Sequence, residues 1–244
     1  MTQPAKQIQG IFNRIAPVYD QMNDGLSLGQ HRIWKRMAVD WSQPKPGGTA
    51  LDLCCGSGDL TGLLAQKLGM NGQVYGVDFS PELLAIAQTR PKPITFPTAV
   101  IHWIEADVLA LPFPDSTFDC ATMGYGLRNV TDIPGSLKEL YRVLKPGAKA
   151  AILDFHRPQS PLMQQFQQLY LNWIVVPMAE RLSLKEEYAY INPSLDRFPI
   201  GSQQVQLAQE AGFKSAIHYG IAGGMMGILV VEKPNIAEKL NQAC

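Results

Sequence analysis

Hydrophobic residues along this chain fall into two alternating patterns, short apolar runs and apolar positions at helical spacing. The apolar runs are typical of strands and cover residues 49–55, 73–79, 100–106, 118–125 and 148–155. Helix-spaced leucines lie between them, with one set at residues 60–68 and another at 137–144. Because strands that alternate with helices pair in parallel through right-handed crossovers, the pattern predicts an α/β fold with helices on both faces of a mostly parallel sheet.

The two ends of the chain follow different patterns. Helical faces at residues 8–15 and 33–41 precede the first strand and are interrupted by Pro17 and by a polar, turn-forming stretch. After a helix at 202–211, two apolar runs at 216–221 and 225–233 are separated only by Ala222-Gly223-Gly224, which predicts an antiparallel hairpin. We therefore expect a Rossmann-like, seven-stranded sheet that ends in an antiparallel C-terminal hairpin, with an N-terminal helical lid.

No repeat, low-complexity tract or linker divides the 244 residues, and this length fits one α/β domain. Within residues 1–244 we expect a lid segment at 1–46, a cofactor-binding core at 47–156, and substrate-side helices with edge strands at 157–244. Residues 162–176 read as an apolar helix that packs mainly in the core. Its residues Trp173 and Tyr170 would also suit the entrance of a site through which a long hydrocarbon tail enters from a bilayer.

Composition narrows the function classes. Lys+Arg and Asp+Glu both number 21, so the basic field of a nucleic-acid-binding protein is absent from the sequence. Neither the four cysteines nor His31, His102, His156 and His218 show the spacing of metal ligands, and we expect no metal. No signal peptide or membrane-spanning run is recognisable. We expect a cytoplasmic protein that is soluble or attached peripherally to a membrane.

A glycine-rich turn follows the first predicted strand. Its pattern is D-x-x-x-G-x-G, with Asp52 on the strand and Gly56-Ser57-Gly58 in the turn, and Asp78 ends the second strand. This layout is typical of nucleoside binding, where glycines approach the ligand and the second carboxylate accepts from a ribose. The dinucleotide-binding motif G-x-G-x-x-G has a third glycine at the position that Thr61 occupies in this chain. The additional acid at Asp52 favours a ligand with an ammonium group, so we infer S-adenosylmethionine (SAM) and not NAD.

Each residue of this predicted cofactor site has an expected role. The loop of Gly56, Ser57 and Gly58 would receive the methionine moiety, and Asp52 would hold the ammonium group directly or through backbone and water. The other expected contacts are Asp78 to the ribose, Phe79 and Val108 beside the adenine, Asp107 to its exocyclic amine, and Gly124 near the sulfonium. Asp107 has a structural alternative to this contact with the ligand, in which its carboxylate only caps the turn before Leu109.

The same motifs carry a family resemblance. The segments 52–61, 110–115 and 144–147 resemble class I SAM-dependent methyltransferases. The blocks 19–24, 27–35 and 126–130, and the run 107–119, resemble more closely the C-methyltransferases of ubiquinone and menaquinone biosynthesis. Segments at 191–194 and 221–227 are similar to the branch of oxygenic phototrophs that methylates a phylloquinone precursor. The resemblance implies methylation of a ring carbon of a lipophilic, prenylated 1,4-naphthoquinol. A benzoquinol or another small molecule is the alternative.

Catalytic candidates follow the fourth strand and lie in the N-terminal block. Arg128 would stabilise a phenolate as charge develops on the quinol, with Asn129 positioning a water or hydroxyl. A salt bridge from Arg128 to acids of the N-terminal block is its structural alternative. Tyr19, in the lid, is expected to touch substrate. The pair Asp154 and His156 is a weaker candidate for a base.

Three matters stay open at this stage. A nicotinamide dehydrogenase is opposed by the glycine pattern, whereas a noncatalytic sensor of an adenosyl ligand is not excluded. The length of the hydrocarbon tail and the proton acceptor are undetermined. The oligomeric state is also open, with a homodimer as one alternative.

Overall fold

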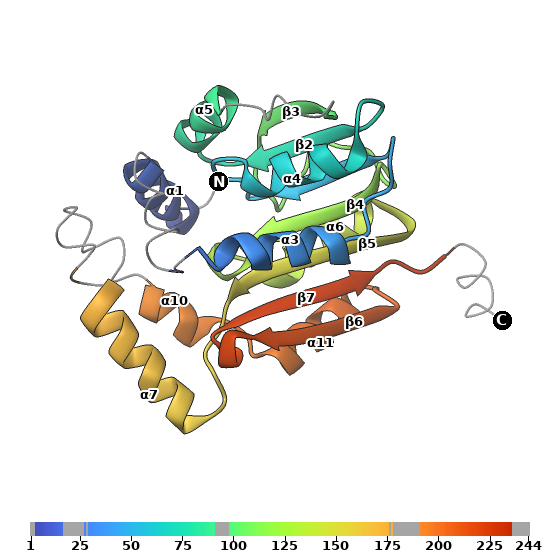
Figure 1. Ribbon diagram of the computed structural model, residues 1–244. Helices are drawn as coiled ribbons and strands as arrows, with labels where there is room; N and C mark the ends of the chain where they lie inside the picture. The colour runs from blue at the N-terminus through green and yellow to red at the C-terminus, as the bar shows by residue number, and fades with distance from the viewer. Residues whose placement is uncertain are drawn as a thin grey trace.

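A computed structural model describes residues 3–16, 27, 29–90, 98–175, 177 and 191–235. Its centre is a sheet in the order β3-β2-β1-β4-β5-β7-β6, as Figure 1 shows. The strands are β1 (Thr49–Leu53), β2 (Gln73–Asp78), β3 (Val100–Glu105), β4 (Phe118–Gly124), β5 (Leu144–Phe155), β6 (Ser215–Ile221) and β7 (Met226–Glu232). The first five pair in parallel, and β7 pairs antiparallel with both β5 and β6. The predicted seven-stranded sheet with its antiparallel hairpin is confirmed.

Helices cover both faces of the sheet, as the alternation of patterns predicted (Figure 1). The helices are α1 (Gln3–Ile15), α3 (His31–Trp41), α4 (Asp59–Leu68), α5 (Pro81–Thr89), α6 (Ile133–Val143), α7 (Pro161–Tyr170), α10 (Ile191–Arg197) and α11 (Gly201–Glu210). One hydrophobic cluster joins α3 and α4 to the sheet, and a second joins α6 and α11 to the opposite face. Successive residues of β1 point to different clusters, Ala50 to the first and Leu51 to the second, as the two-residue period of a strand requires.

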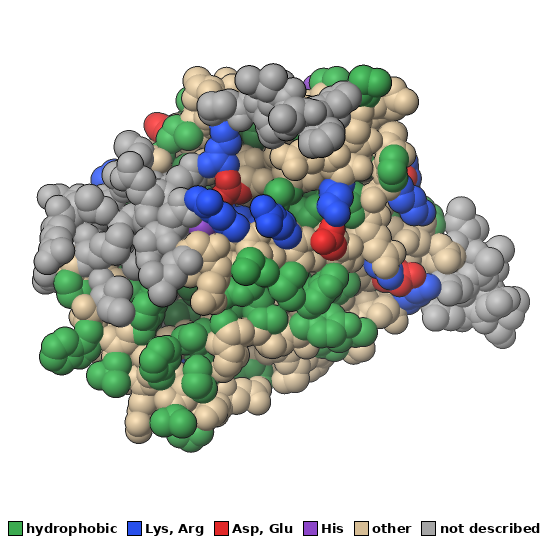
Figure 2. Space-filling model, viewed as in Figure 1, with side chains coloured by type: hydrophobic (Ala, Val, Ile, Leu, Met, Phe, Trp, Pro, Cys, Tyr) green, Lys and Arg blue, Asp and Glu red, His purple; other side chains and the backbone are tan. Residues whose placement is uncertain are grey.

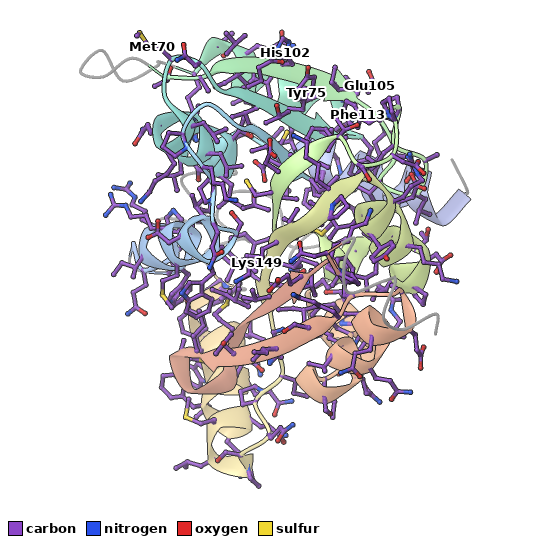
Figure 3. All side chains as sticks on the ribbon, turned by 90° about the vertical axis from the view of Figure 1, so that its right-hand side faces the viewer. Met70, Tyr75, His102, Glu105, Phe113 and Lys149 are labelled. Carbon is purple, nitrogen blue, oxygen red and sulfur yellow. The ribbon has the colours of Figure 1, made fainter. Side chains whose placement is uncertain are left out.

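Aromatic side chains close the second hydrophobic cluster near β2 and β3. Tyr75 stacks on His102 with ring centroids 4.6 Å apart, and Phe113 meets Tyr75 edge to face at 5.4 Å. Figure 3 shows these three side chains at the same end of the sheet. Such arrangements contribute about 0.5–1.5 kcal/mol beyond the area they bury. They fix the two strands whose carboxyl ends carry the predicted ribose and adenine contacts.

Two predicted elements differ from the structure. The segment Lys145-Pro146-Gly147, whose proline and glycine predict a turn, lies within β5, where the register with β4 shifts between Phe118 and Cys120. The turn residues are therefore accommodated as an irregularity at the start of a longer strand. The helix predicted at 162–176 is α7 followed by a π-helix, η3 (Leu171–Val175), and much of its apolar surface is exposed.

Candidate functional site

The glycine-rich turn and the end of β2 are joined through one carboxylate. Asp78 Oδ2 accepts a hydrogen bond from the backbone N–H of Gly56 at 2.8 Å, and its Oδ1 accepts from the N–H of Ser80 at 2.9 Å. Ser80, followed by Pro81 in the position that favours a helix start, caps α5 by accepting from the N–H of Leu83 at 3.2 Å. Burial raises the pKa of Asp78 to about 6, and these backbone donors oppose the rise. The carboxylate is thus held rigidly at the carboxyl end of the strand.

A pocket lies at this edge of the sheet. Seven of the predicted site residues line it: Gly56, Asp78, Phe79, Asp107, Val108, Gly124 and Asn129. They come from the ends of β1, β2, β3 and β4, where ligands bind in open α/β sheets. Asp107 also accepts from the N–H of Leu109 at 3.0 Å, so it serves as a turn cap and still faces the pocket. The structure therefore brings most of the predicted cofactor residues to one pocket.

Asp52 occupies a different position from the pocket residues. It is fully buried, and its two carboxylate oxygens accept from the hydroxyl groups of Thr61 at 2.6 Å and Thr122 at 2.8 Å. It is absent from the pocket lining, and burial raises its pKa to about 6. Asp52 ties β1 to α4 and β4 under the glycine loop. Of the two roles expected for it, this geometry favours the indirect one, through the backbone.

Gly58 and Ser57 are also outside the pocket lining. Gly58 is the N-cap of α4 with φ +88°, a conformation that suits glycine. A Cβ atom there would lie 2.6 Å from Cη2 of Trp103, and one at Gly76 would lie 2.7 Å from the same ring. The second glycine of the motif thus serves the turn and the packing of Trp103. Sequence reasoning missed Trp103, because its contacts come from another strand.

Arg128 is paired with a partner that the sequence did not suggest. Its backbone N–H donates to Asp154 Oδ2 at 3.0 Å, and its Nη1 donates to Asp154 Oδ1 at 2.5 Å. Nε donates to Ser194 Oγ at 3.2 Å, and the guanidinium lies 5.1 Å from the ring centroid of Phe155. The side chains of Arg128 and Asp154 are 9% and 1% exposed. The observed partner is at the end of β5, and the acids of the N-terminal block that the structural alternative named, Asp20 and Asp24, lie outside the described residues.

Asn129 lines the pocket with an unpartnered acceptor. Its Nδ2 donates to the carbonyl oxygen of Tyr125 at 3.2 Å. Among buried side-chain oxygens and nitrogens in the described residues, its Oδ1 alone lacks a hydrogen-bond partner. A buried polar atom without a partner is costly, so such an atom in a pocket points to a ligand donor. Tyr19, the other predicted substrate contact, lies outside the described residues.

The N-terminal helix α1 adds side chains to the pocket that the sequence did not identify. Phe12 lines the pocket and meets Phe79 edge to face, with ring centroids 6.2 Å apart. Gln9 donates to the carbonyl oxygen of Phe79, and Ser80 Oγ donates to Asn13 Oδ1 at 2.7 Å. The helical spacing of the Phe12 segment was visible in the sequence, but its partner 67 residues away was not. These contacts hold α1 against the turn between β2 and α5.

The histidines lie apart from this pocket. His31 Nδ1 is 2.6 Å from Ser27 Oγ, which matches the structural role that is common for a lone histidine. His156 Nε2 lies 3.1 Å from His218 Nε2, and burial lowers the pKa of His156 to about 3. In the described ranges, no group of three or more His, Cys, Asp or Glu side chains could hold a metal ion.

Comparison with known proteins gives the family. Residues 1–233 match the ubiE/COQ5 methyltransferase family. A 2-phytyl-1,4-naphthoquinone methyltransferase of Nostoc punctiforme is 68% identical over 93% of this chain and 98% of its own length. The chloroplastic 2-phytyl-1,4-β-naphthoquinone methyltransferase of Arabidopsis thaliana is 52% identical over 90% of this chain and 85% of its own.

Solved structures share the fold at low sequence identity. A SAM-dependent methyltransferase of Thermotoga maritima superposes with a TM-score of 0.63 at 19% identity, covering 93% of this chain and 99% of its own. A phosphoethanolamine N-methyltransferase of Haemonchus contortus in complex with SAM gives 0.59 at 17% identity, over 83% and 52%. The predicted class I methyltransferase fold and the predicted use of SAM are confirmed. With its sheet order, its pocket and its match over residues 1–233, the chain belongs to the ubiE/COQ5 methyltransferase family.

Proposed function

We propose that this protein methylates a ring carbon of a 2-phytyl-1,4-naphthoquinol, which is the reduced form of the prenylated naphthoquinone that its relatives' names describe. The observation that carries the proposal is identity of 68% to 52% over nine-tenths of the chain with proteins of that name from a cyanobacterium and a plant. A benzoquinol remains the competing substrate within the same family.

The pocket fits the predicted cofactor on grounds of its own chemistry. Asp78 is a rigid carboxylate that still has lone pairs for a ribose diol, and Phe79 offers an apolar ring face. Gly56 leaves backbone open to a ligand because it has no side chain. SAM, when bound, supplies an electrophilic methyl group. We assign Gly56, Asp78, Phe79, Asp107 and Val108 to holding it, and Asp52, Ser57 and Gly58 to shaping the loop.

The residues after β4 are assigned to the quinol. Methylation needs an electron-rich ring carbon, which forms more readily when a quinol hydroxyl gives up its proton. Asn129 Oδ1 can accept a hydrogen bond from a quinol hydroxyl and hold it in place. Among the described residues, none is hydrogen-bonded to Arg128 Nη2, so this nitrogen retains donors for an oxygen anion. Arginine is too basic to take the proton itself.

Gly124 and the N-terminal segment complete the proposal. Gly124 lines the pocket at the end of β4, where a side chain would also collide with Leu60. We assign it to close backbone approach to the sulfonium. Phe12 stands at the pocket as part of α1, and we assign the segment that precedes α3, including Tyr19, to a lid that shields the reaction from water. The predicted lid of residues 1–46 is too long, because α3 packs against the sheet.

The substrate is tested with purified protein and chemically reduced quinols. The enzyme is expected to transfer the methyl group of SAM to 2-phytyl-1,4-naphthoquinol at least tenfold more efficiently, in kcat/KM, than to a demethylated benzoquinol with a tail of equal length; about 1.4 kcal/mol of discrimination suffices for that ratio. Mass spectrometry of quinones from a strain that lacks the gene is the second readout. Accumulation of a demethylated benzoquinone in place of a demethylated naphthoquinone would show that the substrate is the benzoquinol and contradict the proposal.

A further inference from the structure

The helix α7 and the π-helix η3 carry their large hydrophobic side chains on the outside. Four of these side chains are more than half exposed: Leu162 (74%), Phe166 (53%), Leu169 (57%) and Trp173 (77%). Their spacing of i, i+4, i+7 and i+11 is that of one helix face, and we call these four residues the α7 stripe. Core packing, the sequence expectation for this helix, is therefore wrong for Phe166, Leu169 and Trp173 and right for Val175, which is buried.

The opposite side of α7 attaches the helix to the body of the protein. Gln167 is buried, and its Nε2 donates to the carbonyl oxygen of His156 at 2.8 Å. Gln164 Nε2 donates to the carbonyl oxygen of Pro158 at 2.8 Å. A buried glutamine thus anchors the inner side of α7, and large apolar side chains lie beside exposed glutamines on its outer side. The outer face of a helix in a globular protein normally carries polar side chains, so the apolar part of this face is adapted to a surface other than water.

Charged residues are absent from this part of the sequence. Residues 159–179 contain no Asp, Glu, Lys or Arg, and the polar positions of α7 are mostly glutamine. Tryptophan is enriched at the boundary of a bilayer, and a charged side chain there must keep its head group in water, which an uncharged glutamine need not do. The stripe and its polar flanks could therefore enter the headgroup region without dehydrating a charge.

A basic patch lies on the same face of the molecule as α7. It consists of the exposed Arg32 and Arg36 in α3 and the partly exposed Arg90 after α5, and the buried Lys35 and the carboxylate of Asp59 line the same hollow. In Figure 2 basic side chains gather over α3 and α4, and the side chains over α7 at the lower left are mostly hydrophobic. Asp59 pairs with both Lys35 and Arg90, so one carboxylate is shared by two cations. Exposed arginines such as Arg32 and Arg36 are complementary to an anionic bilayer surface.

The size of the stripe distinguishes a membrane from a second protein chain. At the observed exposures the four side chains present on the order of 500 Å² of apolar surface. A stable protein interface buries about 800 Å² on each partner, more than the stripe provides. An amphipathic helix on a bilayer needs only a short apolar face and nearby positive charge. None of the described helices is long and apolar enough to cross a membrane, which limits α7 to surface contact.

We propose that the α7 stripe, assisted by the basic patch, docks this protein on the surface of a lipid bilayer that contains anionic lipids. The aromatic and leucine side chains enter the boundary between headgroups and acyl chains, and the basic side chains contact lipid phosphates. The purpose of docking rests on the proposed function, because a phytyl-tailed quinol resides in the bilayer. The docking itself can be measured without any substrate.

The test is co-sedimentation of the full chain with vesicles of phosphatidylcholine, with and without phosphatidylglycerol. We expect the wild type to bind, more tightly when phosphatidylglycerol is present and less tightly as salt rises. Phe166→Gln with Trp173→Gln should lower the vesicle affinity by about tenfold or more, because glutamine keeps the helix and removes the apolar contact. Arg32→Gln with Arg36→Gln should lower only the phosphatidylglycerol-dependent part.

The matched control is Met70→Gln, at a side chain that is 68% exposed and lies at the opposite end of the molecule from α7 (Figure 3). It should bind vesicles as the wild type does. With a water-soluble, short-tailed naphthoquinol, all variants should retain wild-type kcat/KM. Activity on vesicle-borne phytyl substrate should fall for the Phe166/Trp173 variant, and for the Arg32/Arg36 variant only when the vesicles contain phosphatidylglycerol. Failure of the proposed function would abolish both activities in the wild type and leave vesicle binding unchanged.

Two results would overturn the docking proposal. One is equal vesicle binding, or equal absence of binding, in the wild type and the Phe166/Trp173 variant. The other is a wild-type dimer in analytical ultracentrifugation that this variant converts to a monomer, since the stripe would then be an interface between two copies of the chain.

Discussion

The buried pair of Arg128 and Asp154 gives the sharpest test of how this site is built. The perturbation is Arg128→Met, which keeps an apolar stem beside the ring of Phe155 and removes the guanidinium. Asp154 would keep the backbone N–H donors of Arg128 and Phe155 and lose its only described side-chain donor. Ser194 would lose the Nε donor as well. A carboxylate that is 1% exposed would be left without its counter-charge.

The magnitude follows from burial and the number of lost bonds. Removing one partner of a buried ion pair costs about 3–5 kcal/mol, and the two backbone donors that remain on Asp154 favour the lower half of that range. A domain of this kind has only about 5–15 kcal/mol of total stability, so the loss is readily measured. We expect Arg128→Met to lower the free energy of unfolding in urea by about 3 kcal/mol at neutral pH.

A double-mutant cycle separates the pair from unrelated damage. Asp154→Asn removes the charge with almost no change of shape, and it should be destabilising alone because Arg128 is then left buried and charged. The double variant lacks both charges. It should therefore be more stable than the sum of the two single losses predicts, with a coupling of about 1–3 kcal/mol. Strict additivity, or an Arg128→Met variant within about 1 kcal/mol of wild type, would refute the pairing.

Steady-state kinetics on the reduced quinol, at saturating cofactor, then tests the catalytic assignment. If Arg128 also stabilises the phenolate, the folded Arg128→Met enzyme should bind S-adenosylhomocysteine normally and lose turnover by about 10²–10³-fold. Arg128→Lys should recover only part of this, since a point charge cannot reproduce the planar fork of donors. Near-normal turnover with a raised quinol KM would reduce Arg128 to a structural residue.

Three further predictions concern the cofactor side of the molecule. Asp78→Ala should weaken S-adenosylhomocysteine binding by about 2–4 kcal/mol in calorimetry, and unchanged binding would show that Asp78 does not contact the cofactor. The wild type should not bind NADH, and a titration that saturates with NADH would contradict the choice of SAM. Because burial raises the folded pKa of Asp52 to about 6, its charge costs stability above that pH, and the cost disappears as pH falls towards the unfolded value. The stability advantage of Asp52→Asn over wild type in urea should therefore shrink by about 3 kcal/mol between neutral pH and about pH 4, and a pH-independent difference would contradict the shift. Gly58→Ala should lower the free energy of unfolding in urea by about 1–3 kcal/mol. Gly62→Ala, inside the helix that Gly58 caps, should raise it by about 0.5–1 kcal/mol, because a Cβ there meets no atom within 4 Å. Equal effects would argue against the contact between Gly58 and Trp103.

The sequence by itself determined the features that depend on local chemistry. The strand and helix periods, the Ser80 cap, and the glycine turn followed by Asp78 each arise within a few residues of the chain. Their order along the chain was enough to predict the sheet, the hairpin and the edge of the sheet where the pocket lies, because parallel strands bring their carboxyl ends to one edge. Family resemblance added the class of reaction.

Tertiary structure decided what each polar side chain does. Asp52 looks like a ligand in sequence, but Thr122, 70 residues away, occupies one of its oxygens. Arg128 finds its counter-charge in Asp154 on the neighbouring strand, and Trp103 explains a glycine that the motif alone assigns to the cofactor. The outward hydrophobic face of α7 has the same periodicity as a buried one. Periodicity fixes which residues share a face, and only the packing of distant elements decides whether that face meets the core, water or another surface.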